Sequence, residues 1–126
     1  MGTGPHVLSH EVTLLTDLRQ VLETATSYDD AVDALSRSPQ IDESYFIVAG
    51  AVAEQGAVIA RGREKAVDVW RLNSSEPDGW FRLQTNYDRW QPVPSADDRR
   101  TPGVASMRAL GGPDGVTSAR MWEVPS

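Results

Sequence analysis

The sequence predicts an α+β fold, in which two helices come before an antiparallel sheet. Apolar residues recur with helical spacing up to residue 25, whereas residues 45–85 contain runs of β-branched and aromatic residues separated by short polar turns. Turns this short join antiparallel neighbours, because a parallel crossover needs a dozen or more residues. Helices and strands that are segregated in this way are typical of a sheet with helices packed on it.

Two amphipathic helices are predicted before residue 39. From residue 7 to residue 25, the apolar residues follow an i, i+3, i+4, i+7 rhythm. Ser27 starts the second helix, and Asp30 follows three residues later, which resembles a capping box. We expect this helix to end before Pro39, because the proline ring removes a backbone donor and restricts the preceding residue.

Four strands are predicted next, over residues 45–52, 57–61, 67–72 and 80–85. A turn at residues 54–56 joins the first two strands into a hairpin, and a polar turn at 62–65 leads to the third. Residues 73–79, which are rich in Asn, Ser, Pro, Asp and Gly, are predicted to form a loop before the fourth strand.

Two short helices are predicted near the C-terminus. The first runs from about residue 102 to 110, and Pro102 suits its first turn. The glycine-rich residues 111–115 are predicted to end this helix and form a turn. Thr117 can then cap a last short helix that runs to residue 124.

Composition excludes several classes of function. The net charge is −6 and no basic stripe is visible, which argues against binding to nucleic acid. The absence of Cys excludes disulfides, Cys-ligated metals and a thiol nucleophile from these 126 residues. His6 and His10 can share a helix face, but no third ligand is evident, so we expect neither a metal site nor a cofactor. No apolar run approaches the roughly 20 residues that a membrane span needs, and the first residues do not resemble a signal peptide.

Asn86 is a candidate site residue, because it follows an apolar and aromatic run. An Asn side chain offers two N–H donors without carrying a charge. If it is held rigidly, it can point them at an amide carbonyl oxygen that becomes negative during a reaction. The alternative is that Asn86 simply starts a turn, as Asn often does.

The four charges of Asp97-Asp98-Arg99-Arg100 form a second candidate. One interpretation places an Arg inward, where a carboxylate holds it and its planar fork faces a substrate oxygen. The alternative is a solvated or helix-capping segment, in which the acidic residues lie near a helix N-terminus.

Aromatic and glycosylation signals are less specific. Tyr87 and Trp90, together with Trp70 and Trp80, can line a lipid-binding cleft, although aromatic residues at such spacing more often form the core or rim of a sheet. Asn73, in Asn73-Ser74-Ser75, matches the acceptor for N-glycosylation in a predicted loop, and this triplet is also common by chance. A glycan at Asn73 would agree with a secretory route.

Two motifs carry a resemblance to a known family. They are Thr85-Asn86-Tyr87-Asp88-Arg89-Trp90 and Asp97-Asp98-Arg99-Arg100-Thr101-Pro102, and residues 45–50, 54–61, 68–70 and 80–81 precede them in the family's order. Over residues 12–124 the chain resembles the later half of the catalytic subunit of the acid ceramidase and N-acylethanolamine-hydrolysing acid amidase family.

The resemblance implies an N-terminal-nucleophile hydrolase with an αββα sandwich. In this family a proenzyme cleaves itself and exposes a Cys, whose thiol attacks the amide of an N-acyl lipid and forms a thioester. By motif, Asn86 corresponds to the oxyanion-side Asn and Arg99 to the active-site Arg. Tyr87 and Trp90 are then expected to bind substrate. The resemblance also implies a lysosomal location, and we expect peripheral contact with a membrane.

The family's nucleophilic Cys lies upstream of the segment that this chain resembles. We therefore expect residues 1–126 to be a single partial domain, truncated at both ends, whose partners include the missing parts of its own proenzyme or subunit. Alone, this chain is expected not to hydrolyse amides. The alternatives are a non-catalytic lipid- or partner-binding remnant of the fold, and a truncation that does not fold stably.

Overall fold

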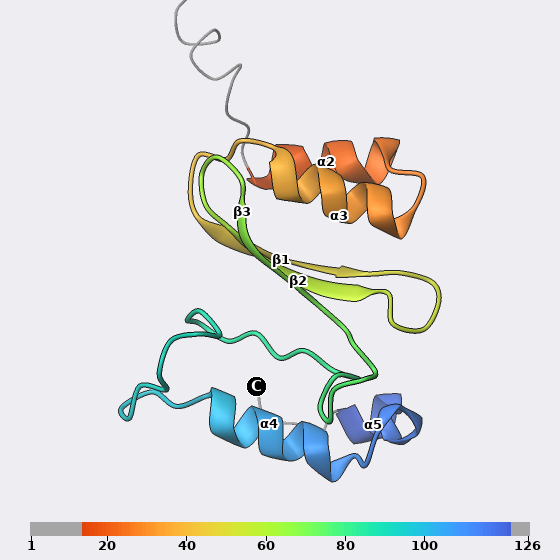
Figure 1. The fold of residues 1–126 in the computed structure, drawn as a ribbon, viewed down its shortest axis with the longest axis vertical. Helices are drawn as coiled ribbons and strands as arrows, with labels where there is room; N and C mark the ends of the chain where they lie inside the picture. Colours follow the sequence, from red (N-terminus) through yellow and green to blue (C-terminus); the bar gives the residue numbers. More distant parts are fainter. Residues whose placement is uncertain (1–13, 122–126) are drawn as a thin grey trace, which may run out of the picture. The chain divides into compact units, whose positions relative to one another are not determined.

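The computed structural model describes residues 14–121, which form two compact units that divide after Arg71. Its elements, in chain order, are α2 (Leu14–Thr24), α3 (Tyr28–Arg37), β1 (Ser44–Ala49), β2 (Gly56–Arg61), β3 (Ala66–Arg71), α4 (Arg100–Ala109), the 3-10 helix η2 (Pro113–Gly115) and α5 (Ser118–Met121) (Figure 1). The first unit thus holds two helices followed by an antiparallel sheet, as predicted. Residues 7–13 of the predicted first helix lie outside the described residues. The expectation that residues 1–126 form one partial domain stays a prediction.

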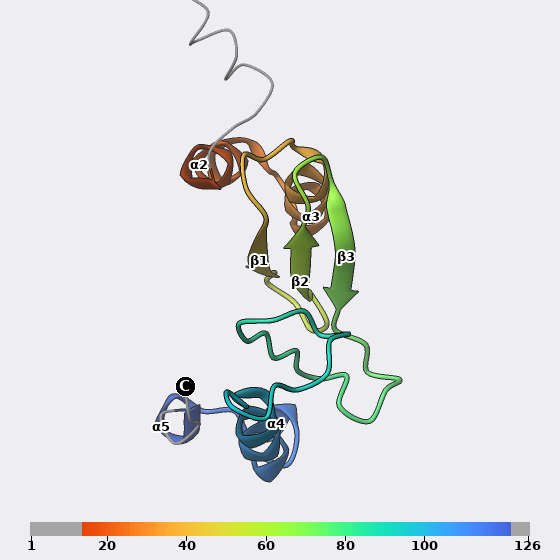
Figure 2. The same cartoon turned by 90° about the vertical axis from the view of Figure 1, so that its left-hand side faces the viewer.

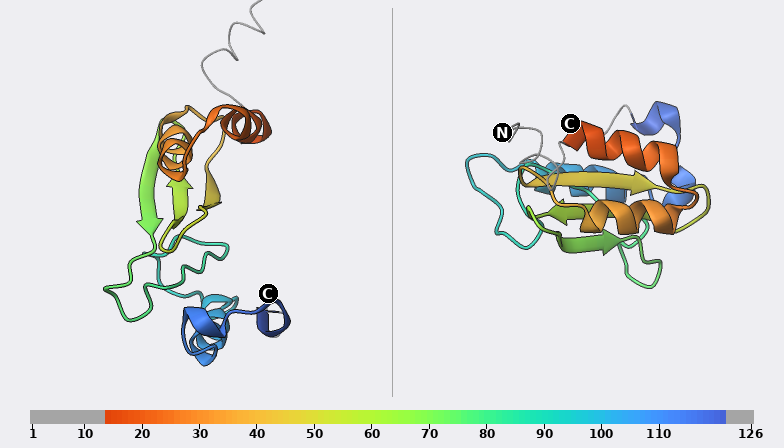
Figure 3. Two further views of the ribbon diagram at one scale, coloured as in Figure 1. Left: turned by 90° about the vertical axis from the view of Figure 1, so that its right-hand side faces the viewer. Right: turned by 90° about the horizontal axis from the view of Figure 1, so that it is seen from above.

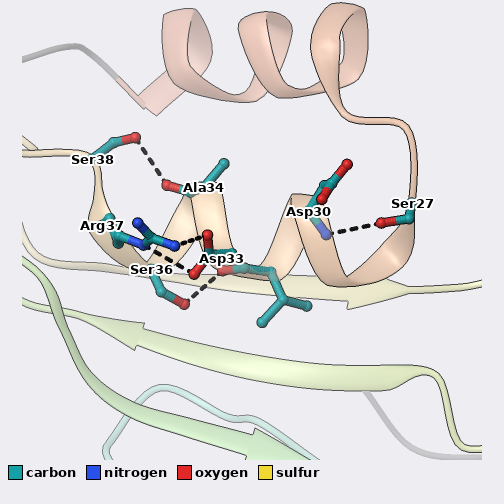
Figure 4. Close-up of polar contacts among 8 residues, drawn as sticks. Ser27, Asp30, Asp33, Ala34, Ser36, Arg37 and Ser38 are labelled. Atoms are coloured by element: carbon teal, nitrogen blue, oxygen red, sulfur yellow. Dashed lines mark hydrogen bonds and ion pairs between the residues drawn. The ribbon is translucent and has the colours of Figure 1, made fainter.

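Local sequence signals set the beginning of α3. Its N-cap is Ser27, whose Oγ accepts a hydrogen bond from the Asp30 backbone N–H at 3.1 Å (Figure 4). In return, the Asp30 carboxylate accepts from the Thr26 hydroxyl at 2.6 Å and the Thr26 N–H at 3.4 Å. These bonds from Thr26 hold the pKa of Asp30 below its usual value. The predicted cap is confirmed, although the returning bond reaches Thr26 and not Ser27.

The end of α3 is also as predicted. The helix ends at Arg37, two positions before Pro39, and Ser38 is its C-cap. The Ser38 hydroxyl donates to the carbonyl oxygen of Ala34 at 2.9 Å (Figure 4). The backbone N–H of Ser38 donates to the same oxygen at 3.2 Å. The carbonyl group of Ala34, in the last turn of α3, therefore keeps hydrogen-bond partners although the helix does not continue.

The sheet has three antiparallel strands in the order β1-β2-β3 (Figure 2). Phe46 of β1 lies opposite Ile59 of β2, which in turn lies opposite Val69 of β3. Every residue of the central strand β2 is buried. The three predicted strands of this region are confirmed, with ends that differ by a few residues from the predicted ones.

The core of the first unit lies between α3 and one face of the sheet. Helix α3 packs on all three strands, and α2 packs beside α3 (Figure 3, right). The buried apolar residues of this cluster are Val21, Val32, Leu35, Phe46, Ala57 and Ile59. Full burial of one such large side chain contributes roughly 1.5–3 kcal/mol, so the burial of this cluster stabilises the unit.

A buried arginine joins the end of α3 to the sheet. Arg61, which is only 2% exposed, donates from Nη1 to the Leu35 carbonyl oxygen at 2.5 Å and from Nη2 to the Ser38 carbonyl oxygen. A cation is favourable at this end of a helix, where the carbonyl groups are unpaired. Burial lowers the pKa of Arg61, and the charge of Asp17 opposes that shift. The buried side chain of Gln40 donates to Asp17 at 2.7 Å.

The predicted fourth strand is wrong. Within the described residues the sheet has three strands, and residues 80–85 are irregular. Their apolar side chains belong instead to a cluster with α4, which comprises Phe81, Met107 and Leu110 with Trp80, Leu83 and Val104 packed against it. An apolar and aromatic run predicts burial, but the partner here is a helix, and no strand among residues 14–121 pairs with this backbone.

The helices near the C-terminus agree with the sequence. Helix α4 begins two residues before the predicted start, and Gly111 and Gly112 follow it with φ values of 83° and 130°. Glycine adopts these conformations without steric cost. Thr117 Oγ1 accepts from the Arg120 N–H at 3.2 Å at the start of α5, as predicted. The predicted continuation to residue 124 lies outside the described residues. No helix among residues 14–121 has the length and apolar character to cross a membrane.

Candidate active site

The first candidate residue, Asn86, lies in an irregular loop that hydrogen bonds from side chain to backbone hold in place. Gln84 Nε2 donates to the carbonyl oxygens of Thr85 and Tyr87, at 2.9 and 3.0 Å. The amide of Gln84 therefore bridges the residues on both sides of Asn86. Asn86 itself is exposed, so the loop presents its side chain at the surface of this unit.

One carboxylate brings the two predicted catalytic residues together. Asn86 Nδ2 donates to Asp97 Oδ2 at 3.0 Å, and Arg99 Nε donates to Asp97 Oδ1 at 3.0 Å. Each oxygen of Asp97 thus receives one of the two side chains. The Arg99 side chain is 59% exposed and that of Asp97 is 47% exposed. Asn86 and Arg99 therefore share one polar cluster, which the sequence motifs alone did not show.

Some hydrogen-bond donors of Asn86 and Arg99 are not used within the cluster. Within residues 14–121, Nη1 and Nη2 of Arg99 have no hydrogen-bond partner, because Asp97 engages Nε alone. The Asn86 amide carries two N–H bonds, and its contact with Asp97 uses one of them. An uncharged amide donor beside a planar cation can bind an oxygen atom that carries, or develops, negative charge.

The other two charges of the Asp97–Arg100 run have different partners. Asp98 Oδ1 accepts from the Thr101 N–H at 2.8 Å at the start of α4, and the bonds from Thr101 are the main reason why the pKa of Asp98 lies below its usual value. Arg100 donates to the carbonyl oxygens of Asp88 and Gln91, at 2.9 and 3.1 Å. The Asp98 bond agrees with the predicted helix-capping interpretation. Arg99 is held by a carboxylate, as the other interpretation expected, but its side chain is exposed and not inward, and its contact with a substrate oxygen stays a prediction.

The two predicted substrate-binding aromatics have different environments. The guanidinium carbon of Arg100 lies 4.6 Å from the centre of the Tyr87 ring, and the Tyr87 hydroxyl is buried without a hydrogen-bond partner in the described part of the chain. Trp90 is 51% exposed. Tyr87 is therefore part of the support for the loop, whereas Trp90 offers an open apolar surface. Trp80 packs edge-on against Phe81, with ring centres 4.8 Å apart.

The predicted glycosylation residue lies in a loop, as expected. Asn73 is exposed, its Oδ1 accepts from the Ser75 N–H at 3.0 Å, and its Nδ2 donates to Glu76 at 3.3 Å. Its modification stays a prediction. No group of three or more His, Asp or Glu side chains able to hold a metal ion occurs among residues 14–121. His6 and His10 lie outside this range.

Sequence reasoning missed the specific parts that Asp97, Gln84 and Arg100 play in this site. It treated residues 97–100 as one charged block. The available signal was the alternation within the block: Asp97 and Arg99 form one pair, whereas Asp98 and Arg100 bind backbone groups of α4 and of the Asn86 loop. Residues one position apart at a helix start face different directions.

The chain resembles known lipid amidases in sequence. It is 40% identical over 94 residues to N-acylethanolamine-hydrolyzing acid amidase of Mus musculus, which covers 75% of this chain and 26% of that protein. It is 42% identical over 84 residues to human acid ceramidase, which covers 67% of this chain and 21% of that protein. The chain thus spans about a quarter of the length of these curated relatives. No protein-family model matches it.

The chain also resembles a solved structure. The N-acylethanolamine-hydrolyzing acid amidase ortholog of Caenorhabditis elegans aligns with a TM-score of 0.73 and 37% identity, over 88% of this chain and 46% of that one. This likeness confirms the predicted α+β fold class, as part of the fold of an N-terminal-nucleophile hydrolase. The chain is therefore related, over most of its length, to a segment of the acid ceramidase and N-acylethanolamine-hydrolysing acid amidase family.

Proposed function

We propose that this chain is part of an enzyme that hydrolyses the amide bond of N-acyl lipids, such as ceramides or N-acylethanolamines, to a fatty acid and an amine. The relatives are named for these activities. The observation that carries the proposal is the cluster in which Asp97 holds both Asn86 and Arg99. These residues come from the two motifs on which the family resemblance rests.

In the proposed reaction, a nucleophile attacks the carbonyl carbon of the amide, and the carbonyl oxygen gains negative charge. The free N–H of Asn86 and the terminal nitrogens of Arg99 stabilise that charge. The resemblance implies a Cys thiol as nucleophile, so the C–N bond breaks to release the amine and leaves a thioester that water hydrolyses. This sequence contains no Cys, and the thiol must come from outside these 126 residues.

We also propose roles for the aromatic residues, for Asn73 and for the compartment. Trp90, which is half exposed, contacts the acyl chain. Tyr87, whose ring is covered by the Arg100 guanidinium group, supports the surface to which the substrate binds. The word "acid" in the names of both relatives supports work in an acidic compartment such as the lysosome. A glycan on Asn73 and peripheral contact with lipid membranes are compatible with that location.

The experiment that tests this function uses the full-length protein that contains this chain, assayed at acidic pH with a ceramide and an N-acylethanolamine. Asn86→Ala and Arg99→Ala are each expected to lower kcat by about 10²–10³-fold, because each removes a donor to the oxyanion. Asn73→Gln, which alters an exposed loop residue, is the control and should leave kcat unchanged. Wild-type kcat in both Asn86→Ala and Arg99→Ala would contradict the proposal. The 126-residue chain alone is expected to show no turnover.

The second candidate function is a lipid-binding role without catalysis, which the exposed Trp90 and the lack of Cys favour. Tryptophan fluorescence of the 126-residue chain, titrated with an N-acyl lipid, tests it. Binding without hydrolysis by the full-length protein would favour this role, and Trp90→Phe should then remove most of the response. A flat titration would count against it.

A further inference from the structure

We propose that Asp97 is a positioning residue, which orients the donors of Asn86 and Arg99 toward a common oxygen atom. The identity of that oxygen, as the carbonyl oxygen of an N-acyl lipid, rests on the proposed function. The positioning itself rests on geometry, because Asp97 contacts Asn86 through Oδ2 and Arg99 through Oδ1, both at 3.0 Å.

The chemistry of a carboxylate explains how Asp97 selects one orientation of the Asn86 amide. An ionised carboxylate only accepts hydrogen bonds, so the Nδ2 side of the amide must face it and the carbonyl side must face away. One N–H of Nδ2 then binds Asp97, and the other points away from the carboxylate. Without Asp97, nothing among the hydrogen bonds of the described residues would distinguish the two amide orientations.

The contact to Arg99 has a similar consequence. Asp97 binds Nε and leaves both terminal nitrogens without a hydrogen-bond partner in residues 14–121. A carboxylate bound in the fork of two nitrogens would occupy the face that a substrate oxygen needs. Binding through Nε therefore fixes the direction of the guanidinium plane and keeps donors available.

Asp97 holds two side chains that packing does not hold. Asn86 is exposed, and 59% of the Arg99 side chain is exposed, so neither is locked by surrounding apolar residues. Exposed ion pairs contribute little to the stability of a fold. Loss of Asp97 should therefore release the two donors without unfolding the unit, and this separates a positioning role from a structural one.

The neighbouring carboxylate provides a matched control. Asp98 has the same side chain, but it accepts from the Thr101 N–H at the start of α4 and not from Asn86 or Arg99. Asp98→Ala should weaken the helix start and leave the donor pair in place. Asp97→Ala should release the donor pair of Asn86 and Arg99 and leave the start of α4 unchanged.

The first experiment is NMR spectroscopy of the 126-residue chain, observing the side-chain N–H signals of Arg99 Nε and Asn86 Nδ2. In Asp97→Ala both are expected to exchange with water about tenfold faster, because each loses a hydrogen bond to a charged acceptor. Asp98→Ala should leave both rates unchanged, and Asp97→Glu should restore part of the protection. Unchanged exchange in Asp97→Ala, or equal effects of the two Ala variants, would overturn the proposal.

A second variant covers the case in which Asp97→Ala does not fold. Asp97→Asn keeps the shape of the side chain but places a donor N–H group at one of the two oxygen positions, so either the contact with Asn86 at Oδ2 or the contact with Arg99 at Oδ1 loses its acceptor. Faster exchange at one or both of the two signals supports the proposal, and wild-type rates at both overturn it.

The second experiment measures kcat and KM in the full-length protein. Asp97→Ala is expected to lower kcat by about tenfold while KM changes little. Its effect should be smaller when it is added to Asn86→Ala, because only Arg99 is then left for Asp97 to position. If Asn86→Ala and Arg99→Ala lower kcat but Asp97→Ala does not, the positioning role is overturned. If all three variants keep wild-type kcat while the NMR result holds, the proposed function fails and the positioning of the two side chains stands.

Discussion

The two units of this chain hold their backbone in different ways. In residues 14–71, the backbone is paired in two strand ladders and at the caps of α3, and Arg61 adds a buried connection between α3 and β2. In residues 72–99 there is no strand, and side chains such as Gln84 and Arg100 donate to the carbonyl groups of the loop. Both units use an arginine as a donor to backbone oxygens, but one is buried and the other is partly exposed.

The difference explains where a site can form. In a strand ladder, the backbone N–H and C=O groups pair with each other, and successive side chains point to opposite faces of the sheet. This arrangement suits a core such as that around Ile59. An irregular segment braced by side chains can present several polar groups at the surface in a fixed arrangement. The candidate cluster of Asn86, Asp97 and Arg99 lies in the second kind of region.

The largest effect is expected when the buried arginine of the first unit is removed. Arg61→Met should lower the free energy of unfolding by about 3–5 kcal/mol, because it leaves carbonyl groups at the end of α3 unpaired and Asp17 buried without its neighbouring cation. Chemical denaturation followed by circular dichroism measures this change. The control is Arg63→Met, at an exposed position in the turn, where we expect a change of about 0.5 kcal/mol or less. Equal effects would contradict the role assigned to Arg61.

A smaller effect is expected from the corresponding arginine of the second unit. Arg100→Ala should cost about 1–2 kcal/mol, since it removes two hydrogen bonds to loop carbonyls and the stacking on Tyr87. Arg100→Lys should recover only part of this, because a lysine lacks the fork that reaches both carbonyl groups. Hydrogen exchange of the amides in residues 84–91 measures the loosening, and identical exchange in the Lys variant and the wild type would argue against bracing by the fork.

The smallest effect concerns Asp98 and depends on pH. Its pKa in the folded chain lies below the usual value, so its ionised form stabilises the fold at pH values above the usual value of 3.8. That contribution is lost as the pH falls below 3.8 through the lowered pKa. Asp98→Ala should therefore be less stable than the wild type at neutral pH, and the gap should narrow below pH 3.8. Thermal melts across this range measure the gap, and a gap that widens in acid would show that the sign is wrong.

The sequence predicted the first unit well because its signals are local. The Ser27 cap, the stop before Pro39 and the alternation of the strands each depend on neighbouring residues. It failed at residues 80–85, where an apolar and aromatic run looked like a strand. The choice between a strand partner and a helix partner for Phe81 depends on Met107 and Leu110 in α4, which no local pattern shows.

The sequence by itself determined the helix caps, the three antiparallel strands and, through its two motifs, the resemblance that named Asn86 and Arg99. Only the tertiary structure decided that Asp97 joins these two residues, and that Asp98 and Arg100 serve the helix start and the loop instead. The physical reason is that caps and periodicity follow from neighbouring residues. A hydrogen bond between residues 86 and 97 instead requires the loop between them to close, which depends on the packing of the whole unit.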